Sequence, residues 1–426
     1  MDSHSNSSSH LLSTEQLGTY KKAGFLLVHD FFDVSADLEP VMQEIASAVD
    51  LVTEKLAAAG KIQEKHQDKD LHHRLTFIEQ QFPGASVLVH TTTRMGPAMA
   101  KLWSHPKLLD VVEQALAIVE EKKGGSEENM IAGHPVWNLR AKTPRNSLAT
   151  VPWHQDTAYL AAGSEGTLQV TAWIPLCHAT KEMGTLHLLK SSSFSQSCYW
   201  WNNEGEKEKK VTVLPHHLEK GRKEKSSHSE CEEKGDPRSW YLYIKEEDLP
   251  EDGEVVACEV PLGSFILFHN LIPHCSGDNV SDRIRWSVDL RWQRPSQPSG
   301  FEGIHELLLM RTGAAAKKGE EEERKEFMER WEEWRMTMRN KKQKEVTGMV
   351  KEAADEFDTN LKGNKRRKQT EAKNQMEGIL PDELFLLVLG AGLFQEGRLG
   401  EAIEALEVEV LRHPMNDCHV FAMKGL

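Results

Sequence analysis

The chain has 426 residues, 39% apolar and 28% charged, so it is long enough for two or three domains and has the composition of a soluble globular protein. Its formal net charge of −14 argues against a general nucleic-acid-binding protein, because phosphate contacts require a basic face. No stretch of the sequence is apolar for long enough to span a bilayer, so a membrane partner is not expected.

The six cysteines are scattered and form no C-x-x-C pair, so the sequence indicates neither a zinc cluster nor a secreted disulfide framework. The opening residues, MDSHSNSSSHLLS, lack the basic and apolar regions of a signal peptide. We therefore expect a reducing intracellular compartment, most simply the cytoplasm, and a disordered tail over residues 1–12.

A first domain is predicted over residues 13–340, and it begins with helices. Ser13 and Gln16 have the spacing of a capping box, which predicts a short helix, followed by Gly24 and an apolar strand over 25–28. Apolar residues recur at helical spacing over 35–60 and 105–122. The first third of the chain is therefore expected to be mainly helical support.

From about Val136 the sequence changes to short β-rich runs bounded by Gly, Pro and Asn. These runs are VWNLRAK, LQVTAWIPL, GTLHLLK, EVVACEV, GSFILFHN and IRWSVDLRW. Several short strands with turn signals between them predict a sandwich or a barrel. Residues 202–238 interrupt them with a charged segment that is poor in apolar residues, so we expect a mobile surface insertion in which His216 and His217 are solvated.

Residues 151–160 read VPWHQDTAYL and contain an imidazole and a carboxylate two positions apart. If the segment is a strand, His154 and Asp156 project from the same face and can converge on one point, which a metal ion usually occupies. A later strand leads through a proline turn to His274. Two imidazoles and one carboxylate form the facial triad of non-haem Fe(II) oxygenases, although zinc hydrolases can use similar ligands.

Arg285 favours the oxygenase among these two classes. An oxygenase that consumes 2-oxoglutarate must hold the distal carboxylate of that keto acid, and a guanidinium fork suits a carboxylate. Arg285 lies eleven residues after His274, on the strand that would return past the metal. A zinc hydrolase has no need of this arginine.

Taken together, residues from about Ser13 to Arg311 resemble the phytanoyl-CoA dioxygenase family of Fe(II)/2-oxoglutarate oxygenases. The segments HQD, TAWIPL, GTLHLLKSS and HCSGDNVSDRIRWS follow one another in the family's order. The resemblance implies the iron ligands His154, Asp156 and His274. It also implies a 2-oxoglutarate site formed by Arg285, Ser276, Trp173 and Asn138.

The family's fold and reaction become expectations for this chain. The expected fold class is α+β, with a double-stranded β-helix (a jelly-roll, cupin-like core) and flanking helices. The expected reaction is hydroxylation of a small organic molecule with Fe(II), 2-oxoglutarate and O₂, releasing succinate and CO₂. Asp156 stands where halogenating relatives carry glycine or alanine, which favours hydroxylation over halogenation.

Neighbouring residues compete for two of these roles. His269 is a rival metal ligand, but only His274 has a serine at +2 and an arginine at +11. Arg283 is a rival anchor, but the +11 spacing favours Arg285. Buried histidines are more often core residues than ligands, and Trp173 taken alone would be a core residue. KSSSFSQS replaces the glycine-histidine pair that the family often has beside its substrate, so the resemblance implies no particular substrate.

Beyond the strands, Phe327, Trp331, Trp334 and Met338 share one face of a predicted amphipathic helix that packs on the β domain or binds a partner. Residues 341–376 form a polar linker, in which KRRK at 365–368 is either a nuclear signal or an ordinary basic run. Residues 377–426 resemble a tetratricopeptide repeat, and therefore a small helical hairpin through which a protein partner could bind. A non-catalytic scaffold acting through this repeat and a zinc hydrolase remain the alternatives to the oxygenase.

Overall fold

The computed structural model describes residues 10–92, 95–120, 130–161, 164, 166–191, 213–218, 242–300, 307–312, 321–322 and 324–337. The chain divides into two compact units, residues 1–328 with 418–426 and residues 329–417, and the site described below lies wholly in the first. The expected linker over 341–376 and the repeat-like segment over 377–426 lie outside the described residues. No helix in the described ranges is both long enough and apolar enough to cross a membrane.

Six α-helices and a π-helical turn precede or border the strands in the described part of the chain. The capping box is confirmed, because Ser13 caps helix α1 together with Gln16, and Gly24 ends it in the left-handed conformation at φ 78°. Leu12 is buried and its N–H donates to Gln114, so residues 10–12 are ordered rather than part of a disordered tail. The helices are α1 (Thr14–Ala23), the π-turn (Val34–Leu38), α2 (Glu39–Ala58), α3 (Arg74–Gln81), α4 (Ala85–Thr92), α5 (Pro97–Trp103) and α6 (Pro106–Glu120).

The larger of two main sheets has seven antiparallel strands. Their order is β1-β9-β4-β11-β2-β12, and β3 also pairs with β11. The strands are β1 (Phe25–Val28), β2 (Met130–Gly133), β3 (Asn138–Lys142), β4 (Val170–Pro175), β9 (Phe265–His269), β11 (Arg285–Gln293) and β12 (Leu308–Thr312). The sequence analysis predicted all of these except β2 and β12.

The smaller sheet has the order β10-β5-β8, formed by His274–Ser276, Leu186–Lys190 and Glu254–Ala257. Residues 151–154 run beside β10, because His154 forms an antiparallel bridge with His274 and the N–H of Ser276 donates to Val151. A short ribbon pairs β6 (His217–Leu218) with β7 (Leu242–Tyr243). Mixed helices and two antiparallel sheets of this kind are compatible with the expected jelly-roll core.

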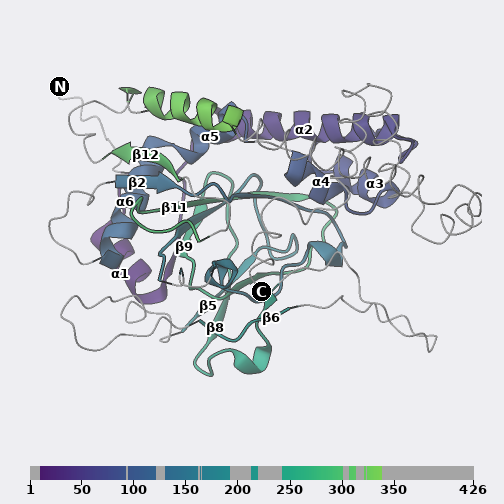
Figure 1. Ribbon diagram of the computed structural model, residues 1–426. Helices are drawn as coiled ribbons and strands as arrows, with labels where there is room; N and C mark the ends of the chain where they lie inside the picture. Colours follow the sequence, from purple (N-terminus) through teal and green to yellow (C-terminus); the bar gives the residue numbers. More distant parts are fainter. Residues whose placement is uncertain are drawn as a thin grey trace, which may run out of the picture. The chain divides into compact units, whose positions relative to one another are not determined.

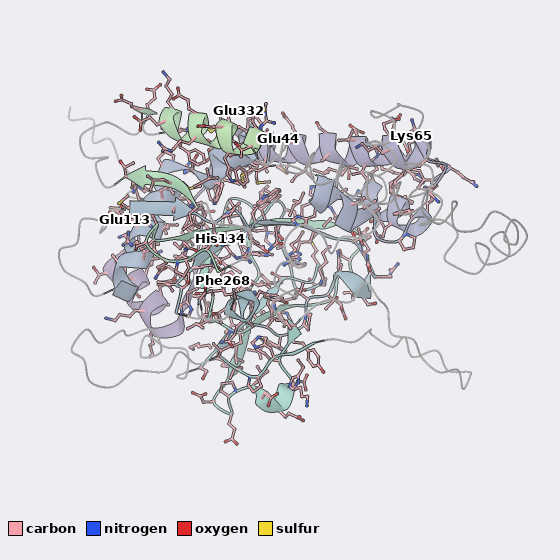
Figure 2. All side chains as sticks on the ribbon, viewed as in Figure 1. Glu44, Lys65, Glu113, His134, Phe268 and Glu332 are labelled. Atoms are coloured by element: carbon pink, nitrogen blue, oxygen red, sulfur yellow. The ribbon has the colours of Figure 1, made fainter. Side chains whose placement is uncertain are left out.

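The two faces of β11 have different partners, which follows from the alternation of side chains along a strand. On the outer face, the indole N–H of Trp286 donates to Leu71 and that of Trp292 donates to Trp103. Figure 1 shows α2, α3, α4 and α5 along this side of the larger sheet and β5 and β8 on the opposite side. Figure 2 labels His134 and Phe268 in the interior. The inner face of β11, which carries Arg285, Ser287, Asp289 and Arg291, therefore points toward the smaller sheet.

The amphipathic helix expected near residue 330 is present over 324–337. Phe327 belongs to the first unit, where its ring lies 6.3 Å from that of Trp103. Within the second unit, the Arg335 guanidinium donates two hydrogen bonds to Glu332.

Candidate functional site

His154 and Asp156 lie side by side, but only the first of them is in the extended conformation that was predicted for both. His154 is extended, as expected, and exchanges two backbone hydrogen bonds of 2.9 and 3.0 Å with His274. The extended backbone ends at Gln155 (φ −113°, ψ 134°), and Asp156 begins a 3₁₀ turn over Asp156–Tyr159. The two side chains still face the same point, because the residue between them is extended.

Three buried side chains converge on that point. One ligand atom from each of His154, Asp156 and His274 lies within 4.8 Å of the others. Asp156 Oδ1 is 3.5 Å from His154 Nε2 and 3.8 Å from His274 Nε2. No other group of this kind was found among the described residues. The structure therefore brings together the three predicted ligands.

Backbone carbonyls orient both imidazoles. His154 Nδ1 lies 2.9 Å from the carbonyl of Pro152, and His274 Nδ1 lies 2.9 Å from that of Ile272. A carbonyl can only accept, so each Nδ1 carries the proton and each Nε2 presents its lone pair toward Asp156. This is the tautomer that metal ligation through Nε2 requires.

The protonation states also suit a divalent cation. Burial lowers the pKa of His274 to about 4, so this imidazole is neutral at neutral pH. Burial opposes ionisation of Asp156, but the Arg291 charge holds the pKa of this carboxyl well below its usual value. The site thus offers two imidazole Nε2 atoms and one carboxylate.

Arg291, on the inner face of β11, binds the second oxygen of Asp156. Its Nη2 and Nε donate to Oδ2 at 2.9 and 3.2 Å, and all the side chains involved are buried. The role of Arg291 was not predicted from the sequence. Its position on the same strand face as Arg285, six residues on, was the available signal.

Arg285 lies at the start of β11 as a buried cation. It is 3% exposed, and its Nε and Nη1 have no hydrogen-bond partner among the described residues. Its guanidinium carbon is 5.1 Å from the centre of the Trp173 ring, so two of the predicted 2-oxoglutarate residues are in contact. Burial lowers the pKa of Arg285 to about 10, which still leaves it charged at neutral pH.

Lys142 is a second buried basic side chain beside Arg285, and its place in the site was not predicted from the sequence. Its ammonium donates to three neutral oxygens, at 2.9 Å to Ser276 Oγ, 3.0 Å to Ala149 O and 3.3 Å to Thr150 Oγ1. Ser276 Oγ also accepts from the N–H of Val151, so its own proton is free for another acceptor. Strand alternation from Asn138 through VWNLRAK could have indicated Lys142.

Asn138 and His269 were also considered for the site on the basis of the sequence. Asn138 is half-buried on β3, four residues before Lys142, and lies opposite Asp289 of β11. His269 ends β9 on the opposite face from Phe268, whose ring is 4.9 Å from that of His274. The ring of His269 lies 6.3 Å from that of Tyr20 in α1. The rival histidine therefore faces away from the three converging side chains.

Part of the charged insertion contacts the segment that carries the ligands. His216 Nε2 accepts the N–H of Gln155 at 3.0 Å, and the N–H of Leu214 donates to Gln155 Oε1 at 2.8 Å. On the other side of the insertion, the N–H of Ile244 donates to Trp153 at 2.7 Å. The prediction that His216 is solvated is wrong, because the ring is half-buried and bound to the residue between His154 and Asp156.

The chain is similar to one known protein family and to several solved structures. The model of the phytanoyl-CoA dioxygenase (PhyH) family matches residues 20–287. The α-ketoglutarate-dependent epimerase SnoN from nogalamycin biosynthesis is 14% identical, with a TM-score of 0.37, over 69% of this chain and 88% of its own. The non-heme monooxygenase ThoJ is 16% identical (TM-score 0.40, 70% and 83% covered), and EctD from S. alaskensis with bound Fe is 17% identical (0.37, 67% and 78%). No curated protein sequence matches the chain.

Proposed function

Because the chain belongs to the phytanoyl-CoA dioxygenase family, we propose that it hydroxylates a small organic molecule and releases succinate and CO₂. It is an enzyme of the Fe(II)/2-oxoglutarate oxygenase superfamily, and its cofactors are iron and 2-oxoglutarate. The observation that carries the proposal is the convergence of His154, Asp156 and His274 in the same molecule as an unpaired, buried Arg285.

The residues present fit the metal. Two imidazoles that present Nε2 and one carboxylate oxygen are the donor set of a facial triad, which suits Fe(II) and leaves coordination positions open. The proton on each Nδ1 is already held by a backbone carbonyl, so the rings need no rearrangement to bind. When bound, the iron and its keto acid would supply the oxidising chemistry.

The residues around Arg285 fit the keto acid. A buried guanidinium with two unpartnered nitrogens is costly unless an anion pairs with it. Arg285, the Ser276 hydroxyl and Lys142 would hold the distal carboxylate, and the Trp173 ring would line the same pocket. Asn138, farther along β3, would lie nearer the metal end. These groups bind and orient the co-substrate and exclude water from it.

The inner face of β11 also supports a polar ligand. Ser287 Oγ and Asp289 Oδ1 on this face, and Thr171 Oγ1 on the neighbouring strand β4, are buried without a hydrogen-bond partner in the described part of the chain. Unsatisfied buried polar atoms usually have a ligand or water to bind. A zinc hydrolase, the alternative that the triad alone allows, would give Arg285 and its polar neighbours no role.

Anaerobic titration with Fe(II) and then 2-oxoglutarate tests the proposal. We expect stoichiometric binding of each and a metal-to-ligand charge-transfer band from the chelate. A panel of candidate substrates can then be scored by the succinate that each releases. Binding of Zn(II) with no response to 2-oxoglutarate would favour the hydrolase instead.

A further inference from the structure

Asp156 has two oxygens that could reach a metal, but its surroundings treat them differently. Oδ1 faces the two imidazoles, at 3.5 and 3.8 Å. Oδ2 accepts both the Nη2–H and the Nε–H of Arg291, at 2.9 and 3.2 Å. Two charge-assisted hydrogen bonds to one oxygen hold the carboxylate in a fixed rotation.

Arg291 is itself held firmly. Its third nitrogen, Nη1, donates to the carbonyl of Val136 at 3.4 Å. Its backbone carbonyl accepts from the His134 N–H at 2.9 Å and from the Trp103 indole at 3.2 Å. Its strand, β11, is paired on both sides. The guanidinium is therefore positioned by the fold before any metal binds.

We propose that Arg291 is a positioning residue that limits Asp156 to one metal-binding oxygen. A carboxylate that swung round to bind through both oxygens would occupy a fourth coordination position. With Oδ2 held by Arg291, three positions remain, as required for a keto acid that binds through two atoms and for O₂. This inference rests on the proposed function, since it assumes that the triad binds iron.

The same geometry predicts how the site responds when the carboxylate is removed. Asp156→Gly would leave the Arg291 cation buried without its anion, beside the space that the carboxylate occupied. A small carboxylate such as acetate has the size and charge of the deleted group. Arg291 should therefore bind acetate there and return an oxygen ligand to the metal.

Fe(II) titrations of wild type, Arg291→Gln, Asp156→Gly and the double variant test the inference. We expect Arg291→Gln to weaken Fe(II) binding by about 10- to 100-fold, the usual effect of removing a group that orients a ligand. We expect Arg291→Lys to recover part of that loss. In the Asp156→Gly background, Arg291→Gln should cause no further loss, because two residues that act through one contact are not additive.

The effect of acetate on Fe(II) affinity is a second measurement. It would not depend on Arg291 if this residue only stabilised the fold. Acetate should tighten Fe(II) binding to Asp156→Gly and should have no such effect on the double variant. Arg294→Gln is a matched control, because Arg294 is also buried and next to β11 but bonds the backbone carbonyl of Met130. Thermal unfolding of each variant identifies any that fail to fold. If Arg291→Gln does so, Arg291→Lys replaces it, and its smaller loss of Fe(II) affinity must still exceed that of Arg294→Gln.

The outcomes separate this inference from the proposed function. If the wild-type protein binds no Fe(II), the proposed function is wrong, and the inference with it. If the wild-type protein binds Fe(II) and Arg291→Gln binds it equally well, the inference alone is wrong. Equal losses from Arg291→Gln with and without Asp156, or acetate rescue that persists in the double variant, would also overturn it.

Discussion

Lys142 and Arg285 lie directly opposite each other on the neighbouring antiparallel strands β3 and β11. Both are buried, at 1% and 3% exposure, and neither forms a salt bridge with a carboxylate of the described residues. Burial, with the nearby Arg285 charge and despite Asp278, lowers the pKa of Lys142 to about 6. Arg140 also disfavours the charged form, and His187 and Cys275 are the other titratable groups close by.

This pair predicts that 2-oxoglutarate binding takes up a proton. At pH 8 the free enzyme holds Lys142 mainly neutral, and a carboxylate bound beside it would raise its pKa again. The affinity for 2-oxoglutarate should therefore fall as the pH rises above about 6, by up to tenfold per pH unit until the pKa of the complex is reached. Calorimetry at pH 8 in buffers of different ionisation enthalpy should show an uptake of about one proton. Lys142→Met should bind more weakly and take up none; equal uptake by this variant would contradict the assignment.

Arg285→Ala should weaken 2-oxoglutarate far more than Fe(II). Removing one partner of a buried, charge-assisted contact costs about 2–5 kcal/mol, much of it from the carboxylate left unpaired. Arg283→Ala is the matched control, because Arg283 is two residues away and exposed. The measurement is the dissociation constant of each ligand under anaerobic conditions. A selective loss in Arg283→Ala with Arg285→Ala unaffected would show that the anchor is misassigned.

His274→Ala should abolish stoichiometric Fe(II) binding, whereas His269→Ala should retain it. The first removes one of three converging ligand atoms, and the second alters a ring that packs against Tyr20 on the other face of the sheet. Because His269 is fully buried, thermal unfolding should accompany the titration, with His269→Gln as the substitute if the alanine variant is unstable. Retained binding in His274→Ala would place the third ligand elsewhere.

With any accepted substrate, the product should contain oxygen even in concentrated chloride. Asp156 supplies an oxygen at the position that a halide would need, and its negative charge disfavours a second anion there. Mass spectrometry of the product decides the question. Asp156→Gly should lose hydroxylation, and a chlorinated main product from the wild-type enzyme would contradict the prediction.

The sequence predicted the three converging side chains and most strands of the larger sheet, because these depend on local spacing and alternation. It did not predict Lys142 or Arg291 as site residues, because their roles depend on which strands pair and in what register. Lys142 meets Arg285 only through the pairing of β3 with β11. The prediction for His216 was wrong for a related reason. The composition of its segment predicted a solvent-exposed ring, but a contact with Gln155, 61 residues away, buries the ring in part.

The backbone bridge between His154 and His274 closes a loop of about 120 residues through two backbone hydrogen bonds. The carbonyls that orient the two rings and the arginine that orients the aspartate are likewise supplied by the protein alone. The entropic cost of bringing these distant segments together is therefore offset by folding itself, before iron binds. Chelation should accordingly give an intact apoprotein that can be reloaded, with the metal adding stability only in proportion to its free concentration. In a cell, the fraction of the protein that holds iron would then follow the concentration of labile iron, and would not be fixed when the chain is synthesised.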